Sequence, residues 1–302
     1  MLYGIIDLGS NTIRLSIYKA EDKTFKLLLN EKSFAGLVGY VEEGVMSEKG
    51  INKACETINS FKELASDFNI EKLNIFATAS LRNIANTEDV IKKIETETGL
   101  RPDVLTGDEE ALFGFYGATY GTEDINTGLF IDIGGGSTEL LYFEGGHVVN
   151  EVSLPIGCLN LYLKYIEGFQ PSREERKKIK SVIKTELDKV EWLKDITVDC
   201  IYGAGGTIRA VKKVCGEFTD NGSFEINSDN IKNMIKDSKD SCKKLYKTFL
   251  KIVPERVHTI IPGMIILKQI TKSTGAQRII VSKYGVREGY LISKVLAGEK
   301  CE

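Results

Sequence analysis

Hydrophobic residues along the chain follow two spacings, which separate the expected helices from the expected strands. Between residues 51 and 68 the apolar side chains stand three or four apart, the spacing of a helix with one buried face. A second helix is expected from a cap at Thr87 to a stop at Gly99, and a third follows a cap at Asp108 over residues 109–120. Further helices are expected after the capping box that starts at Ser172, after residue 207, and from about residues 229, 263 and 286. Short apolar runs predict strands at 73–77, 104–106, 200–202 and 278–281.

The chain contains one internal repeat. Residues 5–12 read IIDLGSNT, residues 130–138 read FIDIGGGST, and Asp132 stands 125 residues after Asp7. In each copy an apolar strand ends in Asp, and a Gly/Ser/Thr turn leads into a second apolar strand, at 13–18 or at 139–143. Two hairpins this far apart indicate two related domains, because a solenoid would repeat at a shorter period.

The pattern of elements predicts an α/β protein with two domains. Hairpin strands followed by alternating strands and helices are typical of mixed sheets covered by helices. The stretch 121–126 is the expected linker, so we expect one domain over 1–123 and another over 124–302. The last helix can pack back on the first domain.

Composition excludes several classes of protein. The 302 residues carry a net charge of −3, so bulk charge does not favour binding to nucleic acid or anionic lipid, and a polyanionic ligand needs a local basic site. The six cysteines form no CxxC pair and there are only two histidines, which indicates scattered thiols in a reducing cytoplasm and no His-rich metal site. No apolar run reaches the ~18 residues of a membrane span, and the N-terminal residues do not resemble a signal peptide. A homodimer is compatible with the sequence.

Three glycine-bearing loops suit a phosphate, because glycine lets backbone N–H groups approach closely. The third stands at the start of a helix, whose N-terminus carries partial positive charge. The loop residues expected to bind phosphate are Gly9, Ser10, Asn11 and Thr12 in the first, Gly134, Gly135, Gly136, Ser137 and Thr138 in the second, and Gly205, Gly206 and Thr207 in the third. A single such loop also fits an ordinary turn, but three loops, two of them duplicates, favour phosphate binding.

Three acidic residues are candidate metal ligands. Asp7 and Asp132 each end an apolar strand, where an unpaired carboxylate is costly to bury. A divalent cation beside a bound phosphate would offset this cost, and Mg²⁺ prefers oxygen ligands. Glu139 follows on the returning strand and can face the same place. We therefore expect Mg²⁺ (or Mn²⁺) at Asp132 and Glu139, with Asp7 acting through water. The alternative is that the Asp residues only cap the turns.

Taken together, these elements resemble the actin/Hsp70/sugar-kinase superfamily. Within it the chain resembles the exopolyphosphatase/guanosine pentaphosphate phosphatase (Ppx/GppA) family over nearly its whole length, in the family's short, two-domain form. The matching stretches are 6–12 (IDLGSNT), 77–83 (ATASLRN), 106–111 (TGDEEA), 131–139 (IDIGGGSTE), 203–208 (GAGGTI) and 285–289 (GVREG).

The resemblance implies two ribonuclease-H-like (actin-like ATPase) domains. Each would hold a mixed five-stranded sheet flanked by helices, with the active site in the interdomain cleft. The implied activity is removal of the terminal phosphate from polyphosphate, and also from guanosine pentaphosphate. Glu110 matches the family's general base, and Arg14, Arg82 and Arg256 match phosphate-binding arginines. Planar guanidinium groups suit phosphate, and the first turn of a helix favours an ionised acid such as Glu110.

One departure and two alternatives accompany this interpretation. Family members carry an Arg-Leu-Gly element after the first hairpin, but residues 33–40 read SFAGLVGY, which leaves the chain-length or nucleotide preference open. Glycine loops alone would also suit an ATP-dependent kinase or ATPase of the same superfamily. A non-catalytic binder of guanosine polyphosphates is the third interpretation, although such a protein has no need of a base at Glu110.

Overall fold

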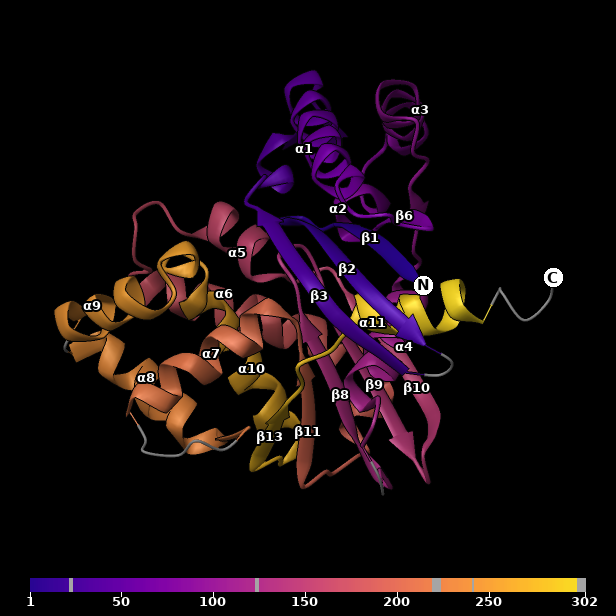
Figure 1. Cartoon of the computed structure of the whole chain (residues 1–302). Coiled ribbons are helices and arrows are strands. Elements are labelled where there is room, and N and C mark those ends of the chain that lie inside the picture. The colour runs from indigo at the N-terminus through magenta and orange to yellow at the C-terminus, as the bar shows by residue number, and fades with distance from the viewer. Residues whose placement is uncertain (22–23, 123–124, 219–223, 241, 298–302) are drawn as a thin grey trace. The chain divides into compact units, whose positions relative to one another are not determined.

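The computed structural model describes residues 1–21, 24–122, 125–218, 224–240 and 242–297 (Figure 1). Contacts divide the chain into two compact units, Met1–Glu110 together with Tyr290–Glu302, and Ala111–Gly289. The chain therefore enters the second unit within helix α4 (Gly107–Thr119). The linker expected at 121–126 includes residues 123–124, which lie outside the described residues, so the boundary between 123 and 124 stays a prediction.

The first unit is built on a five-stranded mixed sheet in the order β3-β2-β1-β6-β7. Strand β1 pairs antiparallel with β2 and parallel with β6. Helices α1 and α3 pack together, and α1 also contacts β1 and β2 (Figure 1). The elements of this unit are β1 (Leu2–Leu8), β2 (Ile13–Glu21), β3 (Thr24–Ser33), a 3-10 turn (Leu37–Tyr40), β4 (Val41–Glu42), β5 (Val45–Met46), α1 (Glu48–Ser66), β6 (Lys72–Ala77), α2 (Ala79–Arg82), α3 (Thr87–Thr98), β7 (Asp103–Val104) and a π-helical segment (Leu291–Leu296).

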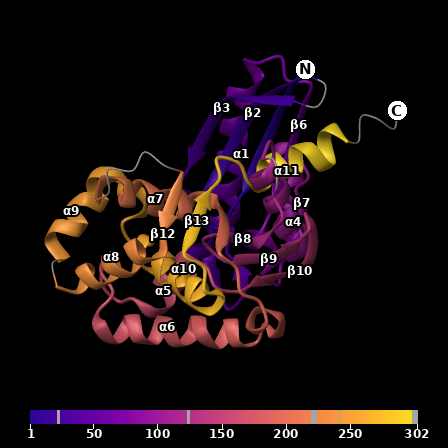
Figure 2. The same cartoon turned by 90° about the horizontal axis from the view of Figure 1, so that it is seen from below.

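The second unit is built on a six-stranded sheet in the order β10-β9-β8-β11-β13-β12. Helix α10 contacts α5, α6, α7 and α8, and Figure 2 shows these helices gathered around it. The elements are β8 (Thr127–Ile133), β9 (Thr138–Glu144), β10 (His147–Leu154), α5 (Cys158–Tyr165), α6 (Arg173–Asp188), a 3-10 turn (Glu191–Lys194), β11 (Cys200–Ala204), α7 (Gly205–Phe218), β12 (Glu225–Asn227), α8 (Ser228–Asp240), α9 (Cys242–Ile252), a second 3-10 turn (Pro254–Arg256), α10 (Ile260–Thr274), β13 (Arg278–Val281) and α11 (Val286–Tyr290).

The second sheet is buried on both faces at its central strand β8. Leu129 and Ile131 of β8 belong to the core that contains α10, whereas Phe130 between them packs with Phe115 of α4 and Phe143 of β9. Successive side chains of a strand point to opposite faces, so a strand with two buried faces has a continuous apolar sequence. This explains the uninterrupted run LFI at the centre of β8.

The two hairpins are structural duplicates. Leu8 pairs with Ile13 around the loop 9–12, and Ile133 pairs with Thr138 around the loop 134–137. The amide of the first loop residue donates to the carbonyl of the fourth in both, over 3.2 Å in the first hairpin and 2.9 Å in the second. The strand register thus reproduces the offset of 125 residues seen in the sequence.

The expected fold class is confirmed, with differences in detail. Both sheets are mixed and flanked by helices, but the second has six strands rather than five because β12 extends its edge. The third helix is capped by Thr106 rather than Asp108, since the Thr106 hydroxyl accepts from Glu109 N–H over 3.1 Å. Asn86 precedes α3, and the Thr87 hydroxyl instead donates to the carbonyls of Leu81 and Ile84. Among the described residues, no helix is long and apolar enough to cross a membrane.

Candidate active site

The loop of the first hairpin, residues 9–12, is held through its carbonyl groups by residues of the stretch 33–40 (SFAGLVGY). The carbonyls of Ser10 and Asn11 accept from the amides of Val38 and Gly36, over 3.1 and 2.9 Å. The amides of Ser10 and Asn11 bond to no described residue. The Nδ2 atom of Asn11 and the Oγ1 atom of Thr12 are buried and also lack a partner among the described residues. Buried polar groups are normally bonded, so this loop keeps unused donors for a ligand.

The loop of the second hairpin has the same arrangement. The carbonyls of residues 134–136 accept hydrogen bonds from the amides of Cys158, Leu159 and Asn160 and from the Asn160 side chain. This close approach needs glycine at 157, because a Cβ there would stand 2.2 Å from the Gly135 carbonyl oxygen. The amides of Gly135 and Gly136 bond to no described residue. Consecutive unbonded amides of this kind can donate to an anion.

The third loop lies beside two of the predicted side chains. Strand β11 runs parallel to β8 with Ala204 opposite Asp132. A Cβ at Gly205, whose φ is +79°, would stand 1.9 Å from the Asp132 carboxylate, and a Cβ at Gly206 would stand 2.2 Å from the Arg256 guanidinium. The second unit therefore brings Asp132 and Arg256 to the first turn of α7, where helix amides have no intrahelical acceptor.

Two of the hydroxyl groups that the sequence assigned to phosphate binding, those of Thr138 and Thr207, already have partners within the protein. The Thr138 Oγ1 donates to the Ile156 carbonyl over 2.5 Å, and Thr207 Oγ1 lies 3.5 Å from the Cys158 sulfur. Both threonines are almost fully buried. Their loops can offer backbone amides to a phosphate, but these hydroxyls already have partners.

The two hairpins differ in the charge that faces their Asp residues. Asp132 pairs in register with Glu139, whereas Asp7 pairs with Arg14. Glu139 is 1% exposed, and Ser153 donates to its Oε1 over 2.9 Å. Among the described residues no group of three or more His, Cys, Asp or Glu could hold a metal. A carboxylate pair still fits Mg²⁺, which is usually held by one or two carboxylates together with phosphate oxygens and water.

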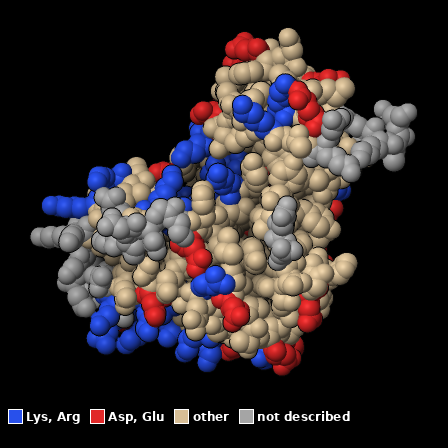
Figure 3. Space-filling model, turned by 60° about the horizontal axis from the view of Figure 1, so that its bottom comes forward, with Lys and Arg blue, Asp and Glu red and all other residues tan. Residues whose placement is uncertain are grey.

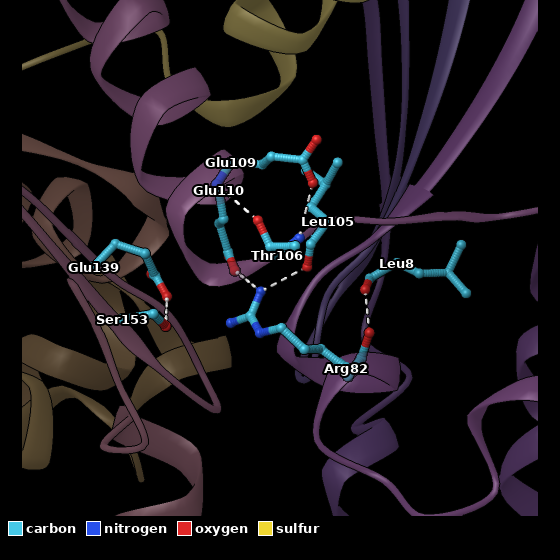
Figure 4. Close-up of polar contacts among 9 residues, drawn as sticks. Leu8, Arg82, Leu105, Thr106, Glu109, Glu110, Glu139 and Ser153 are labelled. Carbon is cyan, nitrogen blue, oxygen red and sulfur yellow. Dashed lines mark hydrogen bonds and ion pairs between the residues drawn. The ribbon is translucent and has the colours of Figure 1, made fainter. Parts of the chain in front are cut away.

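Arg82 and Glu110 form an ion pair in the first unit (Figure 4). The Arg82 Nη1 lies 2.7 Å from Glu110 Oε2 and donates to the Leu105 carbonyl over 3.0 Å. Arg82 ends α2, which follows β6, and the Ser80 hydroxyl of the same turn donates to the Leu8 carbonyl at the end of β1. Glu110 is 8% exposed in the first turn of α4. Both side chains are thus held where β1 and β6 end.

The neighbouring acid, Glu109, has a different environment. The Thr106 amide donates to its Oε2 over 3.0 Å, and Lys294 of the π-helical segment lies 3.4 Å from its Oε1. The Thr106 amide, with Lys294 in support, holds the pKa of Glu109 below its usual range. Glu109 completes a capping box with Thr106, which agrees with a structural role for this acid.

Three charged residues near the third loop were not assigned from the sequence. Arg209 donates to the Ser282 carbonyl over 3.3 Å; burial and then the charge of Arg287 lower its pKa, while Asp132 acts in the opposite direction. Arg287 and Glu288 are buried, and the Glu288 carboxylate accepts from the Gly285 amide over 2.8 Å. Arg287 and Glu288 belong to the stretch 285–289 (GVREG), which matches the family and could have indicated them. Arg209 follows the third loop by one helical turn and belongs to no motif.

Duplicated hairpins whose loops keep unbonded amides, on two mixed sheets, define a protein of the ribonuclease-H-like, actin-like class. Residues 16–297 match the model of the Ppx/GppA phosphatase family, so the chain belongs to that family. It resembles a guanosine-5'-triphosphate,3'-diphosphate pyrophosphatase of Vibrio vulnificus, with 28% identity over 70% of this chain and 43% of the relative. It also resembles a bifunctional 3-dehydroquinate synthase/phosphatase of Fusobacterium nucleatum, with 28% identity over 92% of this chain and 44% of the relative. The chain thus spans less than half the length of these curated relatives.

Solved structures agree with this assignment. The Aquifex aeolicus member of the Ppx/GppA family superposes with a TM-score of 0.80 at 28% identity, over 99% of this chain and 98% of the other. An exopolyphosphatase of Cytophaga hutchinsonii superposes with a TM-score of 0.88 at 21% identity, over 99% and 98%. At 21% identity, the similarity to the Cytophaga structure shows a shared fold and nothing more.

Proposed function

We propose that this phosphatase-family protein hydrolyses phosphoanhydrides, releasing the terminal phosphate of inorganic polyphosphate and of guanosine pentaphosphate. The observation that carries the proposal is the Arg82–Glu110 pair. A nearly buried carboxylate, held by an arginine at the end of two parallel strands, suits a general base that must keep one orientation. The name of the Vibrio relative, a guanosine-5'-triphosphate,3'-diphosphate pyrophosphatase, agrees with the second of these substrates.

The reaction is an in-line displacement at the terminal phosphorus. Water attacks, a bond forms between its oxygen and phosphorus, and the bond from phosphorus to the bridging oxygen breaks. Glu110 takes the proton of the water, and the shortened chain leaves with the bridging oxygen. The products are orthophosphate and a substrate one phosphate shorter. Positioning and charge stabilisation dominate catalysis of such reactions.

Each unit has its own groups for phosphate. In the first, the amides of the loop 9–12 are joined by Arg14 and Arg82. In the second, the loop 134–137 and the amides at Gly205 and Gly206 are joined by Arg256. Arginine binds phosphate oxygens through two parallel N–H groups, which fixes orientation as well as charge.

Asp132 and Glu139 would hold Mg²⁺ or Mn²⁺, with Asp7 acting through water. The ion supplies charge neutralisation at phosphate oxygens when it is bound. Support comes from the register pairing of two carboxylates, of which Glu139 is almost fully buried. Like charges directly opposite each other destabilise a sheet, and a cation removes that penalty.

A cytoplasmic location and a substrate other than nucleic acid complete the proposal. Buried free thiols at Cys55, Cys158, Cys200 and Cys215 suit a reducing compartment. On the face drawn in Figure 3, Lys and Arg side chains form several groups, and acidic side chains lie near some of them. The net charge of −3 agrees better with a local site for a small or linear polyanion than with binding to a nucleic-acid duplex.

Parallel assays of four substrates test the proposal. Phosphate release is measured from long polyphosphate, tripolyphosphate, guanosine pentaphosphate and ATP. Release from the first three, with little from ATP, is expected. Turnover of ATP alone would favour the kinase or ATPase alternative, and binding of guanosine pentaphosphate without release would favour the non-catalytic binder.

A further inference from the structure

An exposed aromatic ring stands beside two lysines near the third loop. Phe224, just before the edge strand β12, is 52% exposed. The Lys212 ammonium lies 4.2 Å from the centre of its ring, and the Lys283 ammonium lies 5.0 Å from it. Neither lysine forms an ion pair with a carboxylate of the described residues. Within the described residues, two cations without a carboxylate partner at one apolar ring suit an anion that also has an apolar part.

The backbone holds these three side chains in place. The Phe224 carbonyl accepts from the Val281 amide over 2.8 Å at the end of β13. Lys283 follows that strand, and the Ser282 amide before it donates to the Gly203 carbonyl over 2.8 Å. Arg209 also donates to the Ser282 carbonyl, which ties α7 to this turn. The ring and both lysines are therefore attached to the elements that carry the third loop.

Lys212 is on the same helix as the third loop. It lies six residues after Gly206 on α7, which corresponds to ~9 Å of helix axis. A phosphate chain with its ribose can bridge such a span. A ligand with its phosphates at the start of α7 could thus reach the ring with its other end.

Comparison with other aromatic residues separates this site from ordinary packing. Tyr165 also lies near two lysines, Lys164 and Lys178, but its ring packs against the core of the second unit. Phe169 is exposed to the same extent, at 51%, but its ring lies against that of Tyr246. Phe224 combines high exposure with two adjacent cations.

We propose that Phe224, Lys212 and Lys283 form a subsite for the nucleoside end of a purine nucleoside polyphosphate. The base stacks on Phe224, and the two ammonium groups bind phosphate. This inference rests on the proposed function, because it names which of the two substrate classes the second unit is built to hold. Inorganic polyphosphate would use the lysines but gain nothing from the phenyl ring. Stacking between a base and an aromatic ring contributes a substantial part of nucleotide affinity.

Binding measurements on the full chain test the subsite. The Glu110→Gln chain is titrated by calorimetry with guanosine tetraphosphate and, separately, with tripolyphosphate, so that neither probe is consumed. Phe224→Ala should weaken binding of guanosine tetraphosphate by about 5- to 150-fold and leave tripolyphosphate binding unchanged. Phe224→Trp should retain the affinity, and the equally exposed Phe169→Ala is the matched control. Substituting Lys212 and Lys283 with Gln should weaken guanosine tetraphosphate binding further.

Each outcome decides the inference. Unchanged guanosine tetraphosphate binding in Phe224→Ala, equal losses for both probes, or no guanosine tetraphosphate binding by the parent chain would overturn the subsite. Phosphate release by the wild-type chain is measured separately. A ring-dependent affinity without any phosphate release would overturn the proposed function alone, whereas release without ring-dependent affinity would overturn the subsite alone.

Discussion

Asp132 of β8 lies directly opposite Glu139 of β9 in the register of the second sheet. The equivalent positions of the first hairpin are occupied by Asp7 and Arg14. At this position the second hairpin has an acid where the first has an arginine. A cation therefore faces the Asp of the first hairpin across the strand pair, whereas a second acid faces the Asp of the other. Figure 4 shows Glu139 with Ser153, the hydroxyl that bonds one of its oxygens.

Removing one of the two facing acids should abolish stabilisation by Mg²⁺. A ligand at 100 times its Kd adds about 2.7 kcal/mol to the free energy of unfolding, so the melting temperature of the wild-type chain should rise with Mg²⁺. In Glu139→Gln the rise should be absent, because the pair of carboxylates that would hold the ion is lost. Calorimetric melting of both proteins with and without Mg²⁺ measures the effect. Glu144→Gln, an exposed acid at the end of β9, is the control; an equal Mg²⁺ effect in Glu139→Gln would contradict the assignment.

Arg82 should contribute to turnover in two ways, by orienting the Glu110 carboxylate and by binding phosphate of the substrate. Arg82→Ala leaves a nearly buried carboxylate without its cation, and breaking such a pair costs about 3–5 kcal/mol of stability. Arg82→Lys keeps a charge, but it replaces the fixed planar guanidinium, whose Nη1 bonds both the Glu110 carboxylate and the Leu105 carbonyl, with a freely rotating ammonium. We expect a low kcat in both variants, with the larger loss in Arg82→Ala and partial recovery when guanidinium is added. A raised KM with unchanged kcat would limit Arg82 to substrate binding.

The hairpin loops were predictable because their signal is local. Asp at a strand end, followed by Gly, Ser and Thr, indicates a tight turn whatever surrounds it, and the structure reproduces the turns with the predicted offset. The Arg82–Glu110 pair was not predictable as a contact, since it depends on how β6, β7 and α4 assemble over 28 residues of sequence. The roles of the two residues came from family resemblance, not from this geometry.

Other differences arise where the sequence offers competing signals. Thr106 and Asp108 are both good helix caps, and only the reciprocal bond with Glu109 selects Thr106. Strand β12 was missed because a three-residue edge strand with one buried side chain, Ile226, has no measurable alternation. Strand β3 was missed because its side chains are mostly exposed at a sheet edge, so tertiary pairing decides its conformation.

Alanine substitution at two glycines of α7, Gly205 and Gly216, should change the free energy of unfolding in opposite directions. Gly205→Ala places a side chain at a φ of +79° and against Asp132, so we expect a loss of at least about 1–2 kcal/mol in the free energy of unfolding. Gly216→Ala meets nothing within 4 Å in the same helix and should stabilise by about 0.5–1 kcal/mol. Urea unfolding of the two variants measures the difference. Equal effects would show that the third loop does not need its left-handed residue.

Gly206→Ala should affect activity more than stability. Its Cβ would meet the end of the Arg256 side chain, which can move aside at little cost. The guanidinium would then leave the start of α7, so we expect a higher KM for polyphosphate with a nearly unchanged melting temperature. Steady-state kinetics and a melting curve on the same preparation check this. An unchanged KM would remove Arg256 from the binding groups.

Protonation of His258 should lower the free energy of unfolding as the pH falls. Burial, and then the charge of Arg256, lower the pKa of His258 below its usual 6.5. Below pH 6.5 the unfolded chain therefore binds more protons than the folded one, so this contribution is present above that pH and is lost as the pH falls. Between pH 7.5 and 5.5 the wild-type chain should lose more unfolding free energy than His258→Gln in urea titrations. Parallel pH dependence in the two proteins would contradict the environment described for His258.

The assignment of Glu110 as general base makes the strongest prediction. Glu110→Gln keeps the size and hydrogen-bonding capacity of the side chain but cannot take a proton from water. Loss of a general base typically lowers the rate about 10²–10⁴-fold, while substrate binding should persist because the loops and arginines are intact. Glu109→Gln is the matched control: it alters the capping box at Thr106 and the pair with Lys294, so it should cost some stability and little turnover. Turnover and polyphosphate affinity are measured for both variants. Should Glu109→Gln be the inactive variant, or Glu110→Gln turn over normally, the base lies elsewhere.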